Sequence, residues 1–353
     1  MFRTKYLSLD MGSKNIHILV GSSYKNSIQV DKALVIPTPS KALADGRIED
    51  AAALQSAILQ GLSASKIRAK KVIVTVNSSS IITREITLPV VKEEDLSSMV
   101  EYEIAQYLPI TLDDYVIDYK VLDKLEEDVP KYRLQVAVVP KALTSGYFHF
   151  ISDLNLKPAV LDIHSNSVSK LFAYPMVLNG DIPYSLDQTL AVIDMGHERT
   201  NVHIISKGKM EFSRLVPLGG ANIDADIAGA LDIPLSEAEG LKMAKCDLAG
   251  LKAENERDRR VNQAIEARIN LWAGEIQRIF QYYSSRNTGN QINSIFLSGG
   301  SSNLSGIESY LERLWNIPTR KLNKVDTVKI LKKQNDFRPE LYLNNLGALI
   351  RLL

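Results

Sequence analysis

One pattern occurs twice in this chain and restricts its fold more than any other feature. The first copy is YLSLDMGSKNIHILV, from Tyr6 to Val20, and the second is TLAVIDMGHERTNV, from Thr189 to Val202. Each copy is typical of an apolar strand, an Asp-Met-Gly turn and a second strand. Two matching turns of this kind predict a chain built from two related halves.

Alternating strands and helices surround both turns. The first turn is followed by IEDAAALQSAILQGLSAS, which predicts a helix, and by KKVIVTVN, which predicts a buried strand. From about residue 79 to 157 the order strand, helix, strand, strand, helix predicts a small inserted domain. The first helix of this segment has one apolar face, formed by Leu96, Met99, Val100, Ile104 and Tyr107.

The second half of the chain repeats this alternation. A helix is expected near 162–174, and a helical block with apolar residues at a period near 3.6 is expected over about 220–287. The stretch NSIFLSGGSSNLSGI then predicts a strand that turns at two glycines into a helix. The final segment, LYLNNLGALIRLL, is apolar enough to predict a helix that packs across a domain boundary.

The glycine turns indicate an anionic ligand. A glycine that follows an aspartate at a strand end permits a tight turn and leaves backbone N–H groups unshielded, which suits a phosphate group. One such turn is weak evidence because many hairpins contain glycine. Two turns, together with the third glycine loop LSGGSSNLSG, predict one ligand shared in a cleft.

Composition narrows the class of protein. A chain of 353 residues with 45% hydrophobic and 24% charged residues is typical of a soluble protein with two or three domains. The 42 basic and 41 acidic residues leave a net charge of +1, so bulk charge attracts neither nucleic acid nor anionic lipid, and only a local basic patch stays open. The single cysteine, Cys246, excludes an internal disulfide. Because no apolar run approaches the ~18 residues that span a bilayer, we expect a cytoplasmic protein without direct membrane insertion.

The three turns together resemble the nucleotide-binding motifs of the superfamily that contains actin, sugar kinases and heat-shock chaperones. LDMGSKN resembles its first phosphate loop, IDMGHERTN its second, and FLSGGSSNLSGI its adenosine loop. The insert, TREITLP, EYEIAQYLPI, VIDYKVL and LQVAVVPK, resembles that of the type IV pilus assembly proteins of the PilM family and, more distantly, the FtsA division proteins. The implied fold class is α/β: an actin-like, duplicated ribonuclease H-like nucleotide-binding fold with an inserted small α+β subdomain.

The resemblance implies four subdomains. The first, 1A, covers 1–78 and is completed by about 158–187 and 335–353. The insert, 1C, covers 79–157. The remaining two are 2A, over 188–219 with about 290–334, and the helical subdomain 2B, over 220–289.

The resemblance also implies that ATP or ADP binds with Mg²⁺ between the halves. Asp10 and Asp194 would face the Mg²⁺ ion from opposite sides through water. Glu239 and Lys242 would border adenine and ribose, with an ordinary exposed salt bridge as the alternative. The residues implied to contact nucleotide are Asp10, Gly12, Ser13, Lys14, Asn15, His17, Asp194, Gly196, Arg199, Thr200, Gly219, Gly220, Glu239, Lys242, Gly299, Gly300 and Ser301.

Two departures from the superfamily pattern argue against rapid hydrolysis. His17 stands where many members carry a lysine that reaches the phosphates, and Glu198 stands where the second loop usually has glycine. At an assumed ~5 Å and an effective dielectric constant of about 20, a carboxylate repels each unit of phosphate charge by roughly 3 kcal/mol. Arg199 could offset this repulsion by pairing with Glu198 or by binding phosphate, or it could be an exposed loop cation.

Catalytic residues are harder to assign from sequence. In the superfamily a water-activating side chain often lies on the helix that links the halves, which here begins AVLDIHSNSVSKL. The nearest candidates are Asp162 and His164, and a histidine at such a place is more often a hydrogen-bonded core residue than a general base. We therefore expect a bound nucleotide with little turnover.

The PilM resemblance implies an adaptor of the pilus inner-membrane platform. Such a protein would hold the N-terminal cytoplasmic tail of a PilN-like bitopic membrane protein in a groove between the first subdomain and the insert, beside other platform proteins. The residues expected to line this groove are Tyr102, Tyr107, Leu108 and Pro109. Nucleic acid is not an expected partner, and a homo-oligomer is left open. The alternatives are an FtsA-like division protein, an actin-like filament former and, with less support from the altered loops, a small-molecule kinase.

Overall fold

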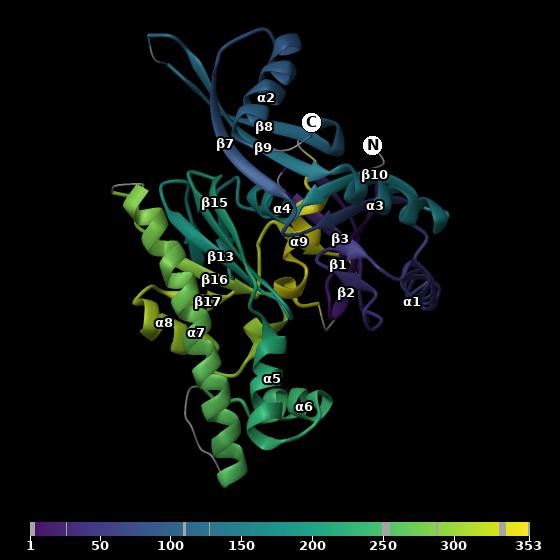
Figure 1. The fold of residues 1–353 in the computed structure, drawn as a ribbon, viewed down its shortest axis with the longest axis vertical. Helices are drawn as coiled ribbons and strands as arrows, with labels where there is room; N and C mark the ends of the chain where they lie inside the picture. Colours follow the sequence, from purple (N-terminus) through teal and green to yellow (C-terminus); the bar gives the residue numbers. More distant parts are fainter. Residues whose placement is uncertain are drawn as a thin grey trace.

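The computed structural model describes residues 4–25, 27–108, 111–126, 128–248, 255–286, 289–331 and 337–351. Two large sheets, each flanked by helices, form the two halves of the molecule, and a third, smaller sheet lies at one end (Figure 1). Within these ranges no helix is both long and apolar enough to cross a membrane.

The first sheet has six strands in the order β10-β6-β1-β2-β3-β18. The strands β1, β2 and β3 form an antiparallel meander, whereas β6 and β10 run parallel to β1. The bounds are Lys157–Ile163 for β10, Lys71–Val76 for β6, Tyr6–Met11 for β1, Asn15–Tyr24 for β2, Ser27–Pro37 for β3 and Val328–Ile330 for β18.

The second sheet repeats this arrangement with five strands in the order β17-β16-β13-β14-β15. Again three strands form an antiparallel meander and two run parallel to its first strand. The predicted duplication is therefore confirmed strand by strand. The bounds are Thr319–Lys321 for β17, Ser294–Ser298 for β16, Thr189–Met195 for β13, Thr200–Ser206 for β14 and Lys209–Val216 for β15.

Helices cover both faces of both sheets. One layer of buried apolar side chains joins the first sheet to α1 and α3, and another joins the second sheet to α5, α7 and α8. The helices α4 and α9 share a core with residues of both sheets, so the predicted packing of the last helix across a boundary is confirmed. The bounds are Ala51–Ala64 for α1, Lys141–Asp153 for α3, His164–Leu171 for α4, Gly220–Leu231 for α5, Leu235–Lys245 for α6, Glu256–Arg286 for α7, Ile307–Trp315 for α8 and Leu343–Leu349 for α9.

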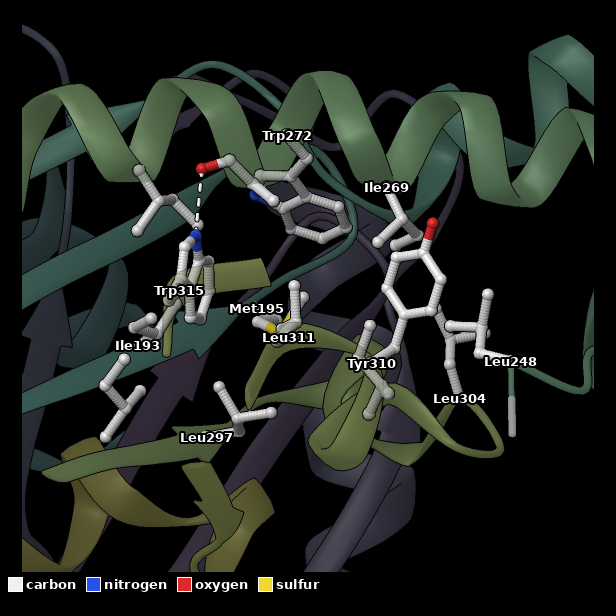
Figure 2. Close-up of a cluster of buried hydrophobic side chains, with 14 of the residues drawn as sticks. Ile193, Met195, Leu248, Ile269, Trp272, Leu297, Leu304, Tyr310, Leu311 and Trp315 are labelled. Atoms are coloured by element: carbon white, nitrogen blue, oxygen red, sulfur yellow. Dashed lines mark hydrogen bonds between the residues drawn. The ribbon is translucent and has the colours of Figure 1, made fainter. Parts of the chain in front are cut away.

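The core of the second half is built on the long helix α7. Its buried positions follow the predicted period near 3.6, and Trp272 lies in the middle of the cluster (Figure 2). The indole of Trp315, from α8, donates a hydrogen bond of 3.1 Å to the carbonyl of Ala273, which satisfies a polar group inside this core. The cluster fixes the second sheet and the loops at its strand ends.

The insert has its own small core. The sheet β7-β9-β8 is antiparallel, and α2 covers one of its faces through Leu96, Val100 and Ile104. Tyr107, predicted on the same face, is 53% exposed, and its ring lies 4.8 Å from the Arg84 guanidinium of β7, so it is not buried in this core. The bounds are Ile82–Pro89 for β7, Glu93–Tyr107 for α2, Tyr115–Leu125 for β8 and Lys131–Pro140 for β9.

Two boundaries differ from the predicted ones. The helix α3, assigned to the insert, packs its buried face into the core of the first sheet, so the insert's own core ends with β9. The helix expected from about residue 162 starts at His164, because Leu161 and Asp162 pair with β6 as part of β10. The remaining short elements are β4 Leu43–Ala44, β5 Arg47–Ile48, η1 Leu112–Asp114, β11 Met176–Leu178, β12 Ile182–Tyr184, η2 Gly300–Asn303 and η3 Pro339–Leu341.

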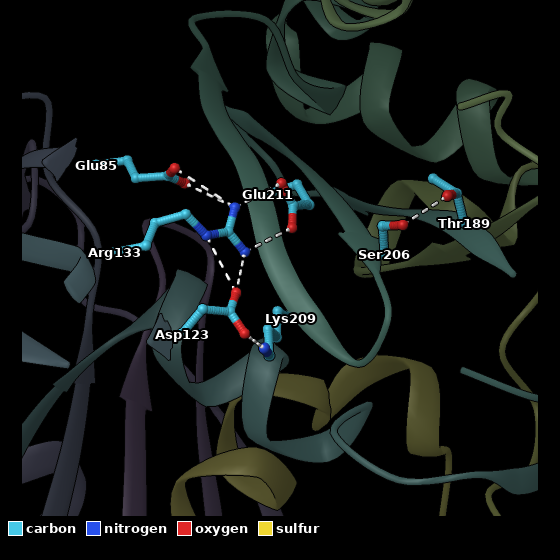
Figure 3. A network of polar contacts seen from close by, with 7 residues as sticks. All are labelled: Glu85, Asp123, Arg133, Thr189, Ser206, Lys209 and Glu211. Carbon is cyan, nitrogen blue, oxygen red and sulfur yellow. Dashed lines mark hydrogen bonds and ion pairs between the residues drawn. The ribbon is translucent and has the colours of Figure 1, made fainter. Parts of the chain in front are cut away.

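Ion pairs connect the insert to the second half (Figure 3). The Arg133 guanidinium on β9 bonds Asp123 of β8 at 2.7 Å and Glu211 of β15 at 3.3 Å. Glu85 of β7 lies 3.4 Å from the same guanidinium, and Lys209 of β15 pairs with Asp123. Because β15 leads from these pairs toward the loop at Gly219, the network connects the insert to the start of α5 through one strand.

Candidate functional site

A cleft of about 410 Å³ lies between the two halves. Both Asp-Met-Gly turns and the third glycine loop meet there, as the sequence predicted. Of the seventeen residues implied to contact nucleotide, fifteen line this cleft: Asp10, Gly12, Ser13, Lys14, Asn15, His17, Asp194, Gly196, Arg199, Gly220, Glu239, Lys242, Gly299, Gly300 and Ser301.

The other two, Thr200 and Gly219, lie behind the lining. The Thr200 hydroxyl donates to the carbonyl of Leu218 at 2.8 Å, so it ties the second turn to the loop before α5. A Cβ on Gly219 would lie 2.3 Å from the carbonyl oxygen of His197. Both residues therefore shape the second turn rather than reach into the cleft.

The two turns have the same local geometry. The N–H of Gly12 donates to the carbonyl of Asn15 at 3.0 Å, and that of Gly196 donates to the carbonyl of Arg199 at 2.9 Å. These glycine N–H groups are thus used inside the turns, contrary to their expected role as phosphate donors. A phosphate would meet the tips of the turns, at Ser13 and Lys14 in the first.

The second turn is also tied to the start of α5. The carbonyl of Gly196 accepts from the N–H of Gly220 at 3.0 Å, and the carbonyl of His197 accepts from the N–H of Ala221 at 2.7 Å. The first N–H groups of α5 are therefore satisfied within the protein. The third glycine loop approaches closely as well, because Gly299 adopts φ +82° and a Cβ there would lie 2.5 Å from the Asp194 carboxylate.

Asn344 joins the two halves at the bottom of the cleft. Its side-chain amide lies 3.1 Å from a carboxylate oxygen of Asp10 and 3.1 Å from one of Asp194. This residue was not predicted from the sequence, although two adjacent asparagines in an apolar helix, Asn344 and Asn345, were a usable signal. A buried amide that bridges both carboxylates fixes how far apart they lie.

The carboxylates fit a hydrated Mg²⁺ ion. Mg²⁺ keeps several waters and is usually bound by one or two carboxylates together with substrate phosphates. Asp10 and Asp194 provide two such ligands beside a phosphate-sized space, and no group of three or more His, Cys, Asp or Glu side chains in the described part of the chain forms a complete protein cage. This arrangement matches a nucleotide-borne ion better than a permanently bound metal.

Three of the five histidines, His17, His164 and His197, line this cleft, and their pKa values shift in different directions. Burial lowers the pKa of His17 and of His197. For His164, burial lowers the pKa, but the negative charge and hydrogen bond of Asp10 raise it by more. Its Nε2 lies 3.1 Å from Asp10. Because Asp10 occupies Nε2 and Nδ1 is buried, neither ring nitrogen is placed to take a proton from an attacking water, which argues against His164 as a general base.

Asp162 lies outside the cleft. Its carboxylate bonds the Lys170 ammonium at 2.6 Å and the Asn166 amide at 2.8 Å, and both ions of the pair are buried. A buried carboxylate with these partners holds α4 against β10. Neither catalytic candidate is therefore positioned as a base for an attacking water.

Three polar contacts cross the cleft. Lys14 of the first turn pairs with Glu239 of α6 at 2.6 Å, and Arg199 of the second turn pairs with Asp45 in the β4–β5 hairpin. The amide of Asn77 donates to Asn201 at 2.6 Å. From the sequence, Arg199 was expected to bind phosphate, to pair with Glu198 or to be an exposed loop cation. Asp45 was not predicted, because nothing local marks a short hairpin as part of the site.

The expected alternative for Glu239 and Lys242, a mutual salt bridge, is not what the structure has. Lys242 is buried, and its ammonium pairs with Asp224 at 2.7 Å and donates to the carbonyl of Gly220 at 3.2 Å. Glu239 instead faces Lys14 across the cleft. Lys242 thus positions the start of α5, and Glu239 lies in the cleft wall, paired with Lys14.

The partner-binding candidates are mostly exposed. Tyr102 is 69% exposed on the outer face of α2, and the ring of Tyr107 lies 4.8 Å from the Arg84 guanidinium. Leu108 packs partly against the insert core, and Pro109 lies outside the described residues. Neither tyrosine is a core residue, and Tyr102 is the more exposed of the two.

A second cavity of about 410 Å³ lies where the insert, the first half and β15 meet. Thr83 of β7, Ile163 of β10 and Leu215 of β15 are among its lining residues. This is the place where a groove between the first subdomain and the insert was expected, although the residues that line it are not the predicted tyrosines.

Comparison with known proteins identifies the family. The model of a family described as type IV pilus assembly protein PilM matches residues 8–345. The chain belongs to this family. FtsA of Bacillus subtilis is 27% identical over 255 residues, which cover 67% of this chain and 57% of that protein. The chain therefore spans little more than half of that curated relative.

Solved structures agree on the fold. A chain from a PilM-PilN type IV pilus biogenesis complex superposes with a TM-score of 0.80 at 20% identity, covering 99% of this chain and 98% of that one. MreB5 of Spiroplasma citri bound to ADP superposes with a TM-score of 0.53 at 14% identity, covering 98% and 94%. The PilM-family chain thus has the actin-like ATPase fold that its duplicated turns predicted.

Proposed function

We propose that this chain is an adaptor of the type IV pilus inner-membrane assembly platform that binds ATP between its halves and the cytoplasmic tail of a PilN-like membrane protein at its insert. The match to the PilM family over residues 8–345 carries this proposal. The cleft supports its nucleotide part, and the cavity beside the insert supports its peptide part.

ATP would bind with its phosphates between the two Asp-Met-Gly turns. Asp10 and Asp194 would hold a hydrated Mg²⁺ ion, which supplies charge neutralisation at the phosphates when bound. Lys14 would exchange Glu239 for phosphate, since an ammonium at the tip of the first turn faces the cleft. Glu239, released by Lys14, would accept from the ribose hydroxyls.

Turnover would be slow. His164 is bonded to Asp10, Asp162 is bonded to Lys170, and Glu198 adds negative charge at the second turn. The test is a titration of purified protein with ATP-Mg²⁺ and a phosphate-release assay, each repeated with Asp10→Ala. Binding that Asp10→Ala removes, with little phosphate release, supports the proposal; sustained release of many phosphates per minute that depends on Asp10 would disprove the slow turnover.

The tail peptide would use the insert. An extended peptide can bind beside a sheet through main-chain hydrogen bonds and side-chain pockets, and the cavity at Thr83 and Leu215 offers such a pocket. The exposed tyrosines of α2 offer an alternative surface on the opposite face of the insert sheet.

Calorimetry with a synthetic tail peptide tests this part. Thr83→Arg fills the cavity, whereas Thr87→Arg places the same side chain at an exposed position of the same strand and is the matched control. Tyr102→Ala tests the outer surface. We expect Thr83→Arg alone to abolish binding; loss with Tyr102→Ala alone would move the site to α2, and no binding by the folded unmodified protein, with or without ATP, would disprove the adaptor function.

The likeness to FtsA gives a second candidate, an actin-like protein that forms filaments. Sedimentation and electron microscopy with ATP-Mg²⁺ test it. Filaments that form in proportion to protein concentration would favour this candidate over a discrete adaptor.

A further inference from the structure

The two ends of the first sheet differ in chemistry. The strands β1, β6 and β10 run parallel, and at their carboxyl ends they reach the nucleotide cleft, where Asp10 and His164 lie. At the opposite end each strand begins at a lysine: Lys5 directly before β1, Lys71 in β6 and Lys157 in β10. A row of cations therefore lies at the end of the sheet that is remote from the cleft.

Neighbouring loops add more positive charge at this end. The connection from α1 to β6 contributes Lys66, Arg68 and Lys70, all exposed. Because β2 is antiparallel to β1 and continues beyond it, the β2–β3 turn also lies here, with Lys25 exposed and placed 5.9 Å over the ring of Tyr24. Tyr24 is 56% exposed. We call Lys25, Lys66, Arg68, Lys70, Lys71 and Lys157 the basic edge.

The cations of the basic edge are not balanced within the fold. Of the acids at this end, Asp31 pairs with Lys5 at 3.0 Å, and Asp153 ends α3. None of the six residues of the basic edge forms a salt bridge with another described residue. Lys71 and Lys157 are direct partners in the β6–β10 register, and like charges placed opposite each other are destabilising.

The concentration of charge is local. The whole chain has a net charge of only +1, so six exposed cations at one end require an excess of acid elsewhere. The basic edge contributes no residue to either of the two cavities described above. Its charge therefore serves neither the nucleotide cleft nor the pocket beside the insert.

We propose that the basic edge docks this protein on an anionic membrane surface. A lysine or arginine near acidic lipids raises the partition coefficient about fivefold, so several together give measurable binding without insertion. Tyr24 suits the same surface, since an exposed tyrosine favours the boundary between water and lipid. A groove lined by stacked aromatic side chains, as single-stranded nucleic acid requires, is not formed by the described residues of this edge.

This proposal rests on the proposed function in one respect, that a pilus platform places the protein beneath a membrane. Docking by the basic edge would orient the cleft away from the lipid, at a distance of about 20 Å set by the length of β6 at ~3.3 Å per residue. An extended tail of ~10 residues spans about 33 Å and would still reach the cavity beside the insert. Lipid contact and tail binding are therefore compatible in one orientation.

Vesicle co-sedimentation of the purified protein tests this inference. Vesicles of phosphatidylcholine are compared with vesicles that contain about one third phosphatidylglycerol, at low salt and at about 0.5 M salt, where the Debye length is only about 4 Å. The variant Lys70→Glu/Lys71→Glu/Lys157→Glu is compared with Lys92→Glu/Lys207→Glu/Arg278→Glu. Both change the net charge from +1 to −5, because each reversal changes it by two, but only the first lies on the basic edge.

We expect the unmodified protein and the control variant to sediment with anionic vesicles at low salt, and the edge variant to bind at least about 100-fold more weakly. Equal binding to neutral vesicles, or equal loss in both variants, would overturn the proposal. Tighter, edge-dependent binding of a single-stranded oligonucleotide than of vesicles would overturn the assignment to lipid. The basic edge is not part of the ATP or peptide sites, so these tests are independent of each other. If the protein binds anionic vesicles but does not bind the tail peptide, this inference is supported and the proposed adaptor function is disproved.

Discussion

Replacing Gly299 with alanine should damage both stability and nucleotide binding. Gly299 has φ +82° and ψ 170°, a region of backbone space that is essentially restricted to glycine, and forcing another residue into it costs about 1–3 kcal/mol. The new Cβ would also lie 2.5 Å from a carboxylate oxygen of Asp194 and 2.6 Å from the carbonyl oxygen of Met195. Overpacking of this kind costs a further ~1–3 kcal/mol.

The neighbouring glycine provides the control. A Cβ on Gly300 meets nothing within 4 Å, and its φ is not positive, so Gly300→Ala should change the free energy of unfolding by less than about 0.5 kcal/mol. The expected loss for Gly299→Ala, about 2–6 kcal/mol, is a large part of an ordinary stability of about 5–15 kcal/mol. The two substitutions are one position apart in the chain, but only Gly299→Ala should lower the free energy of unfolding substantially.

Urea unfolding followed by circular dichroism measures the difference, and titration with ATP-Mg²⁺ follows. We expect a lower midpoint and weaker binding for Gly299→Ala, because displacement of the Asp194 carboxylate moves one of the two groups proposed to hold Mg²⁺. Equal midpoints for the two variants would refute the reasoning, since they would show that the third glycine loop is not held against Asp194.

Three further predictions concern charged groups. A double-mutant cycle with Arg133→Met and Glu211→Gln, measured by urea unfolding, should give a coupling energy of about 0.5–3 kcal/mol that added salt weakens. If the effects of the two substitutions on the free energy of unfolding are simply additive, this contact does not hold the insert to β15. Burial lowers the pKa of His203 to about 3, so the unfolded chain binds one more proton than the folded chain between about pH 3 and 6.5. The free energy of unfolding should therefore fall as the pH falls through this range, by about 1.4 kcal/mol per pH unit, and His203→Gln should remove this slope. An unchanged slope in the variant would assign the pH dependence to another group. Glu198→Gly should raise the affinity for ATP about fivefold at low salt and leave the affinity for adenosine unchanged; the effect is small because Glu198 is exposed. Calorimetry measures both affinities. Equal effects on the two ligands would mean that Glu198 does not act on the phosphates.

The sequence predicted the duplicated sheets because strand periodicity and the repeated turn are local properties. Residues 6–20 and 189–202 contain both their strands and their turn, so little depends on distant parts of the chain. The same holds for α7, whose buried face follows a period that a helix imposes. Helix boundaries could not be predicted as well. The helix expected from about residue 162 starts later, at His164, because Asp162 pairs with β6 as part of β10, and no local pattern reveals that pairing.

The site was predicted through its loops and missed where it depends on packing. Asn344 reaches Asp10 and Asp194 from the last helix, and Asp45 reaches Arg199 from the turn between two strands of two residues each. Both contacts require the halves to be assembled, since their partners are far apart in sequence. The presence of Glu198 in place of the usual glycine could be predicted to affect the site from the sequence alone, because it lies inside a recognised loop.

The central claim is that one protein binds nucleotide in its cleft and a membrane-protein tail at its insert, with β15 and its ion pairs between the two sites. Calorimetric titration of ATP-Mg²⁺ and the tail peptide, separately and then together, tests this most directly. We predict that each ligand binds alone and that each changes the affinity of the other by the same factor, which Arg133→Met reduces toward one. Failure of either ligand to bind the folded protein, or affinities that are independent in the unmodified chain, would contradict the account.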